Sequence, residues 1–125
     1  MGVETILLAE DDAGVRAYVS DVLRSRGFAV LEAADGAAAL RIAEGAGPFE
    51  ILVTDINMPG INGLELARRV RAIRPATGVL YMSGGPPELM AAWCLATVAT
   101  VFLAKPFGPD ALLEGVREAV QQVRK

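Results

Sequence analysis

Short runs of apolar residues alternate along the chain with stretches in which apolar residues recur at the spacing of a helix. Each run is only three or four residues long, and strands that are covered on both faces of a sheet have this continuous apolar pattern. The runs therefore predict five buried strands, which cover residues 6–9, 29–31, 51–53, 79–82 and 100–103.

The stretch after the first run predicts an amphipathic helix. Asp12 is suited to cap the start of this helix, and Gly27 supplies a left-handed residue that can end it. Between these two positions, apolar residues recur at i, i+3, i+4, i+7 and i+8, which places them on one helical face: Val15, Tyr18, Val19, Val22 and Leu23.

The remaining stretches predict four more helices. An alanine-rich helix is expected over 35–43, a second carries apolar residues from Leu64 to Ile73, a third covers 88–95, and the last runs to Val123 with Pro109 near its first turn. Strands that alternate with helices predict a single α/β domain over residues 1–125, a doubly wound parallel sheet with helices on both faces. Ligands of such sheets bind beyond the carboxyl ends of the strands.

The composition excludes several classes of function. The net charge is −3, so a broad basic surface for nucleic acid or an anionic membrane is not expected, and the arginines at 68, 69, 71 and 74 are interpreted as a solvated helix face. No apolar run approaches the roughly 18 residues of a membrane span. Cys94 is the only cysteine and is expected to be a buried small residue. A reducing, cytoplasmic setting is therefore expected.

The chain has no histidine, which restricts its chemistry further. Catalysis by a Ser-His-Asp or Cys-His arrangement cannot be built, nor can a metal site with histidine ligands. Any chemistry must therefore use carboxylates, hydroxyl groups, lysine and a hard metal ion.

Polar residues collect where four of the predicted strands end. The first strand ends at Glu10-Asp11-Asp12, the third at Asp55, the fourth at Ser83 and the fifth at Lys105. Carboxylates that lie so close together repel one another, and Mg²⁺ resolves that repulsion because it prefers oxygen ligands. With lysine and serine available for phosphoryl oxygens, the pattern indicates an anion-transfer site in which Asp55 is the nucleophile.

Each of these residues also has a structural interpretation. Asp12 is better explained as a helix cap than as a metal ligand, and Asn57 suits a turn while its carbonyl group faces the metal. Ser83 and Lys105 could each be ordinary loop residues if taken alone, and the sequence leaves the isomer of the Lys105-Pro106 bond open. A calcium-binding EF-hand over 55–66 is rejected, because Pro59 and Leu66 occupy ligand positions.

At these residues the chain resembles the receiver domain of two-component response regulators, including the receivers fused to hybrid histidine kinases. The resemblance extends from about Thr5 to Val123 and implies the sheet order 2-1-3-4-5. It rests on the order and spacing of four segments: Leu7 to Asp12, Thr54 to Gly63, Met82 to Gly84, and Lys105 to Phe107.

The resemblance implies a role for each site residue. Asp55 corresponds to the phosphoacceptor, Lys105 to the lysine that pairs with it, and Ser83 and Phe102 to the two switch positions. Because Phe102 has no hydroxyl group, a switch at that position must work by packing alone. The implied ligands of Mg²⁺, or of Mn²⁺ in its place, are Glu10, Asp11, Asp55 and the backbone carbonyl of Asn57.

The implied function is Mg²⁺-dependent acceptance of a phosphoryl group from a phosphohistidine on a histidine kinase or a histidine phosphotransfer protein. The domain would assist its own phosphorylation and dephosphorylation without being an enzyme in the usual sense, and it would switch the face around the fourth helix, fifth strand and fifth helix. Leu89, Met90 and Trp93 are candidate partner contacts on that face. The sequence alone allows a stand-alone regulator or a domain excised from a larger protein.

Two alternatives remain open. A degenerate receiver could serve only as a protein-interaction module. A Mg²⁺-dependent phosphohydrolase with an aspartate nucleophile fits less well, because its nucleophile would follow the first strand rather than the third.

Overall fold

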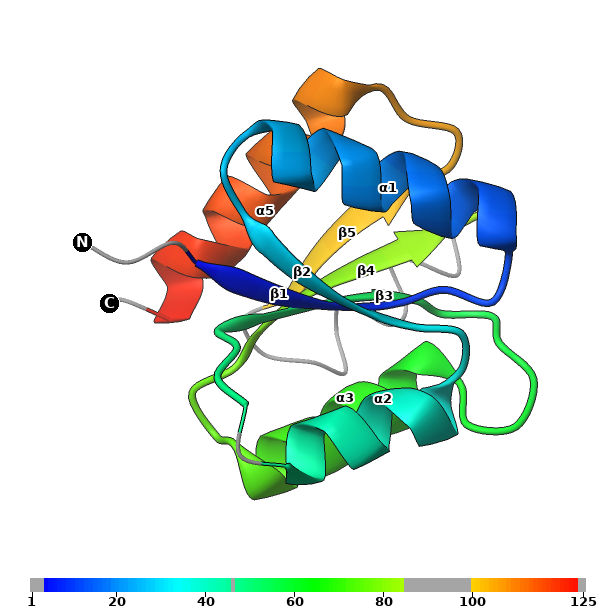
Figure 1. Ribbon diagram of the computed structural model, residues 1–125, viewed down its shortest axis with the longest axis vertical. Coiled ribbons are helices and arrows are strands. Elements are labelled where there is room, and N and C mark those ends of the chain that lie inside the picture. The colour runs from blue at the N-terminus through cyan, green and yellow to red at the C-terminus, as the bar shows by residue number, and fades with distance from the viewer. Residues whose placement is uncertain (1–3, 46, 85–99, 124–125) are drawn as a thin grey trace.

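The fold is a parallel sheet between two layers of helices (Figure 1), in a computed structural model that describes residues 4–45, 47–84 and 100–123. The strand order is β2-β1-β3-β4-β5, and every pairing is parallel. The predicted doubly wound α/β fold and its strand order are confirmed. The strands are β1 (Thr5–Ala9), β2 (Ala29–Ala33), β3 (Ile51–Asp55), β4 (Gly78–Ser83) and β5 (Thr100–Ala104).

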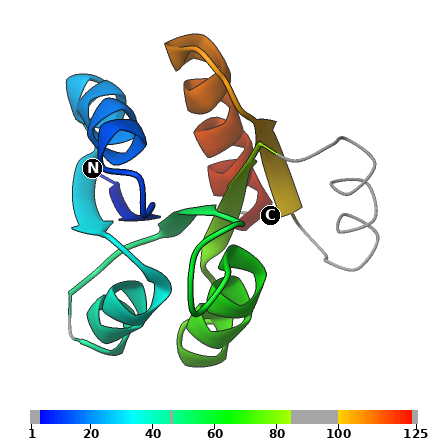
Figure 2. The same cartoon turned by 90° about the vertical axis from the view of Figure 1, so that its right-hand side faces the viewer.

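Helices cover both faces of the sheet, as Figure 2 shows in edge view. Helices α1 (Ala13–Ser25) and α5 (Pro109–Val123) cover one face, and α2 (Gly36–Glu44) and α3 (Gly63–Ile73) cover the other. The helix predicted over 88–95, with Leu89, Met90, Trp93 and Cys94, lies outside the described residues. Among the described helices, none has the length and apolar character needed to span a bilayer.

Alternate residues of each strand pack into two separate cores. Because successive side chains in a strand point to opposite faces, Ile6 and Leu8 pack under α1 and α5 while Leu7 and Ala9 pack under α2 and α3. Residues of β3 and β4 divide in the same way. The central strands are thus buried on both faces, which explains their continuous apolar sequence.

Short polar side chains start three of the helices. Asp12 accepts a hydrogen bond from the N–H of Val15 at 3.0 Å, as predicted from its N-cap position. Asp35 and Asn62 cap α2 and α3 in the same manner. Gly27 has a φ of +93° immediately after the end of α1, so its predicted left-handed conformation is also confirmed.

The arginines of α3 have structural partners. Arg68 and Arg69 both pair with Glu65, and these hydrogen bonds, that of Arg68 first, lower the pKa of the Glu65 carboxyl to about 2. Arg74, just past the end of α3, lies 4.3 Å above the Phe49 ring and donates to the carbonyl of Ala43 at the end of α2. The arginines of this segment are therefore partly exposed to solvent, and Arg68, Arg69 and Arg74 each have a partner in the fold.

The start of α3 packs against the end of β3 with no space for a side chain. A Cβ atom on Gly63 would lie 2.3 Å from the carbonyl oxygen of Asp55 and 2.9 Å from the Cα of Ile56. The N–H of Gly63 also donates to the Ile56 carbonyl at 2.9 Å. This contact fixes the backbone of Asp55 relative to α3.

We expect the substitution Gly63→Ala to destabilise the protein. Alanine is normally the better residue in a helix by about 1 kcal/mol, but here its methyl group would collide with main-chain atoms that cannot turn aside. The free energy of unfolding, measured by urea denaturation, should fall by about 1–3 kcal/mol. Gly47→Ala is the control, because its Cβ would meet no atom within 4 Å and should change stability by less than about 0.5 kcal/mol. Equal effects of the two substitutions would contradict this account of the contact.

Candidate functional site

Three carboxylates meet at the edge of the sheet where the parallel strands end. Glu10 and Asp11 follow β1, and Asp55 is the last residue of β3. Each offers one oxygen, and these oxygens lie within 4.8 Å of one another. Glu10 is completely buried, Asp55 is 6% exposed, and Asp11 is open to solvent. The sequence prediction that these three side chains lie together is thus consistent with the structure.

Lys105 reaches the same cluster from the loop after β5. Its Nζ atom lies 3.0 Å from Oε1 of Glu10 and 3.2 Å from Oδ2 of Asp55. The backbone N–H of Lys105 donates to the Ser83 carbonyl at 2.8 Å, which ties this loop to the end of β4. The Lys105-Pro106 peptide bond is cis.

Burial and charge shift the pKa values of two of these groups. Removal from water raises the pKa of the Glu10 carboxyl, and hydrogen bonds from the Asp12 N–H and from Lys105 offset only part of this effect. Burial alone would lower the pKa of the Lys105 ammonium. Its hydrogen bond to Glu10 and the charges of Asp55 and Glu10 outweigh that, and its pKa lies above the usual value. Lys105 therefore stays charged at neutral pH.

Two further contacts hold Glu10, one at its carboxylate and one at its main chain. The N–H of Asp12 donates to Oε2 of Glu10 at 3.1 Å, and Nη1 of Arg16 donates to the Glu10 carbonyl at 2.7 Å. Sequence reasoning missed Arg16, because nothing in a helical pattern distinguishes an arginine that reaches backward from one that faces solvent.

Asn57 lies beside Asp55 in the loop after β3. Its backbone N–H points to Oδ1 of Asp55 at 3.4 Å, which is a long and weak contact. The residue is exposed. The described contact is made by the N–H group, and the carbonyl group remains a predicted metal ligand.

The two predicted switch residues occupy neighbouring strands. Ser83 is fully buried at the end of β4, one residue beyond Met82, which is paired with Asp55 in the sheet. Phe102 is half-buried in β5 and stacks on Tyr81, with ring centroids 5.3 Å apart. Phe102 therefore packs into the core under α2 and α3.

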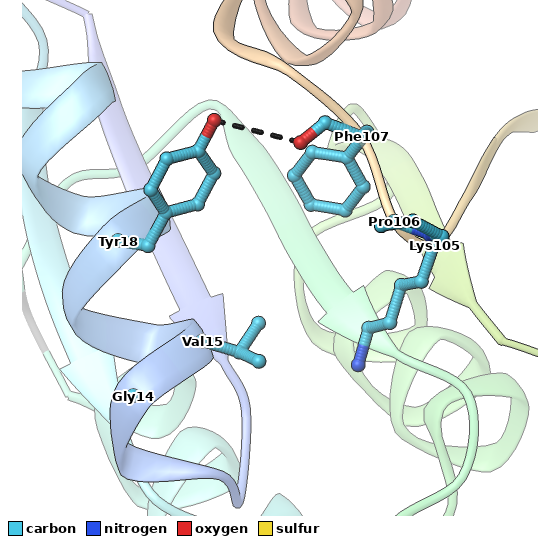
Figure 3. A pocket seen from close by; sticks show the side chains of 6 residues that line it. All are labelled: Gly14, Val15, Tyr18, Lys105, Pro106 and Phe107. Atoms are coloured by element: carbon cyan, nitrogen blue, oxygen red, sulfur yellow. Dashed lines mark hydrogen bonds between the residues drawn. The ribbon is translucent and has the colours of Figure 1, made fainter.

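An apolar groove of about 480 Å³ lies beside Lys105, between α1 and the loop after β5 (Figure 3). Across it, Val15 and Tyr18 face Pro106 and Phe107. Tyr18 is 39% exposed, and its hydroxyl lies 3.5 Å from the Phe107 carbonyl, at the limit of a hydrogen bond. The groove thus presents an apolar surface next to the carboxylate cluster.

Comparison with known proteins places this geometry in a family. Residues 6–117 match the model of the response regulator receiver domain. The chain is 36% identical over 122 residues to the sensor kinase CckA of Brucella abortus, covering 97% of this chain and 13% of the kinase. The chain also matches two other curated relatives. Across these two and the kinase, it spans between 13% and 57% of the relative's length.

Solved structures agree. The receiver domain of the hybrid histidine kinase CckA is 38% identical, with a TM-score of 0.77 over 95% of this chain and 98% of that domain. The chemotaxis protein CheY4 of Vibrio cholerae is 30% identical, with a TM-score of 0.85 over 94% of this chain and 99% of CheY4. The chain belongs to the receiver domain family of two-component response regulators.

Proposed function

We propose that this domain accepts a phosphoryl group on Asp55 from a phosphohistidine of a histidine kinase or a histidine phosphotransfer protein, with the help of Mg²⁺. The observation that carries the proposal is the ion-paired cluster at the sheet edge, where Lys105 contacts both Glu10 and Asp55. In this proposal residues 1–125 act as a single cytoplasmic receiver domain.

Asp55 is the best placed nucleophile of the three carboxylates. Both carboxylate oxygens of Glu10 accept hydrogen bonds, one from Lys105 and one from the Asp12 N–H. Glu10 is also fully buried. Asp55 lies at the end of the central strand, and among the residues that the structure describes its Oδ1 has only the long contact from Asn57. In the transfer, an Asp55 oxygen attacks phosphorus and the phosphorus–nitrogen bond breaks. The imidazole nitrogen keeps the electron pair and takes up a proton.

The donor set fits a hard divalent cation. Three carboxylate oxygens lie within 4.8 Å of one another, and Lys105 is the only described cation that contacts the carboxylate groups of Glu10 and Asp55. Such crowding favours Mg²⁺, or Mn²⁺ with the same ligands, held by Glu10, Asp11, Asp55 and the Asn57 carbonyl. When bound, the ion neutralises charge on the phosphoryl oxygens.

Lys105 and Ser83 stabilise the transferred group in this proposal. The Lys105 ammonium exchanges its contact with the Asp55 carboxylate for one with a phosphoryl oxygen, so its charge stays neutralised. Ser83 donates its hydroxyl to another oxygen, which draws the end of β4 toward Asp55. Phe102 then adjusts its packing against Tyr81, and the change spreads to the face formed by β5, α5 and the helix predicted from the sequence over residues 88–95.

The same site also returns the domain to its starting state. Water attacks the phosphorus of the acyl phosphate and releases inorganic phosphate, leaving Asp55 as a carboxylate. The domain therefore assists its own phosphorylation and dephosphorylation, and acts as a phosphoacceptor rather than as an enzyme.

A protein donor must contact the surface around Asp55 in order to bring its phosphohistidine to the acceptor. The groove between α1 and Pro106-Phe107 shares Lys105 with the carboxylate cluster. An apolar side chain of the donor that fills this groove would be held beside the acceptor. We therefore assign the groove as part of the donor contact.

Intact mass spectrometry tests the acceptor role. Incubation with acetyl phosphate and Mg²⁺ should add one phosphoryl group, an increase of about 80 Da. The adduct should be absent with EDTA and in Asp55→Asn, because the first removes the cation and the second removes the nucleophile. If the wild-type chain folds and binds Mg²⁺ but acquires no adduct from acetyl phosphate, the proposal is refuted. A protein-interaction module is then the better function.

Substitution of Tyr18 tests the groove. Tyr18→Ala should reduce the rate of transfer from a phosphorylated histidine kinase that is active on the wild-type chain by about tenfold, because exposed aromatic residues dominate such contacts. Phosphorylation by acetyl phosphate should not change, since this small donor does not need the groove. Ile73→Ala is the matched control, because Ile73 is 43% exposed on α3, on the other face of the sheet. If Tyr18→Ala lowers the phosphorylation rate equally with the kinase and with acetyl phosphate, the assignment of the groove to the donor contact is contradicted.

A further inference from the structure

The position of the Asp11 carboxylate depends on its main chain. Asp11 is exposed in the loop between β1 and α1, and the described part of the structure gives its side chain no hydrogen bond. Its neighbours differ, because Glu10 is held by Lys105 and Asp12 is held as the cap of α1. Any group that holds the peptide between Glu10 and Asp11 therefore restricts the main chain from which the Asp11 side chain projects.

Arg16 is the group that holds this peptide. Its Nη1 donates to the Glu10 carbonyl at 2.7 Å, which is the short distance of a charge-assisted hydrogen bond. The other face of the loop is held by the Glu10 N–H, which donates to the Ala33 carbonyl at 3.1 Å. These two hydrogen bonds hold the N–H and the carbonyl group of Glu10. They therefore restrict the path that the main chain takes as it leaves the sheet.

Glu32 forms a long ion pair with the guanidinium group. Its Oε1 lies 3.7 Å from Nε of Arg16, and its Oε2 accepts from Ser20 at 3.0 Å and pairs with Arg24 at 3.1 Å. Ser20 is buried, and the Arg16 side chain is only 22% exposed. The partners come from α1 and from β2, which lies beside β1 in the sheet (Figure 1).

The nearby Glu32 carboxylate also reduces a conflict of charge. An arginine beside a cation site would repel the metal ion, and the negative charge of Glu32 offsets part of that repulsion. Arginine suits this task better than lysine, because its planar group can contact the carbonyl and the carboxylate at the same time.

We propose that Arg16, held in place by Glu32, is a positioning residue that orients Asp11 for the metal ion. The inference rests on the proposed function, since it assumes that the carboxylate cluster binds Mg²⁺. Arg16 touches neither the ion nor the phosphoryl group in this scheme. Its effect is to lower the cost of ordering Asp11 when the ion binds.

Calorimetric titration with MgCl₂ tests the inference. Arg16→Met should raise the Kd for Mg²⁺ about tenfold, as expected for loss of a residue that supports a metal ligand. Arg16→Lys should fall between this variant and the wild type, because lysine can keep the bond to the carbonyl. Arg24→Met is the matched control. It removes an arginine that contacts Glu32 but not Glu10, is 51% exposed, and should change the Kd by less than about twofold.

Two further readouts separate positioning from general destabilisation. At saturating Mg²⁺, the rate of phosphorylation of Arg16→Met by acetyl phosphate should return close to the wild-type rate, because the nucleophile is intact. In the metal-free protein, amide hydrogen exchange at Asp11 and Asp12 should increase in Arg16→Met and not in Arg24→Met. If Arg16→Met fails to fold, Arg16→Lys and Glu32→Gln carry the same comparison.

The possible outcomes distinguish the two proposals. If the wild type binds Mg²⁺ and Arg16→Met binds it equally well, the positioning role is wrong and the proposed function stands. If Arg16→Met and Arg24→Met weaken binding equally, the effect is one of helix stability and the positioning role is again wrong. If the wild type does not bind Mg²⁺, the proposed function itself fails, and the positioning role fails with it.

Discussion

One ammonium group holds together the edge of the sheet on which the site depends. Lys105 contacts Glu10 and Asp55 at 3.0 and 3.2 Å, and without a cation these two carboxylates would repel each other. The burial that raises the pKa of the Glu10 carboxyl shows how unfavourable an uncompensated charge would be here. Lys105 therefore offsets the negative charge that Glu10 and Asp55 bring to this edge of the sheet.

The two helical layers hold this edge from opposite faces. On one face, Gly63 lets α3 approach the Asp55 backbone so closely that no side chain fits between them. On the other, Arg16 of α1 holds the Glu10 carbonyl and is itself held by Glu32 of β2. The parallel sheet gathers the strand ends, and these contacts fix the main chain at the ends of β1 and β3, where the carboxylates lie. Packing on both faces thus determines the geometry of the site.

The sequence predicts the sheet well, because buried strands and helix caps depend on local pattern. The apolar runs, the Asp12 cap and the residues at the strand ends were all identified from the sequence. Contacts between distant segments could not be predicted in this way. The Arg16–Glu32 pair and the contact of Arg74 with the Phe49 ring each join residues that lie far apart in the sequence, and no local pattern indicates which residue is the partner. The role of the Asn57 carbonyl depends on the direction of a peptide, which residue type does not determine.

Among several crowded carboxylates, Asp55 is the one that accepts the phosphoryl group in the proposed function. Reduction of the phosphorylated chain with borohydride converts an acyl phosphate into an alcohol, and tandem mass spectrometry of the resulting peptides locates the altered residue. The change is expected at Asp55 alone, in the segment that ends β3. A change at Asp11, Asp12 or Glu10 would contradict the proposed role of Asp55, because the nucleophile would then lie at the end of β1 and the cluster would have a different function.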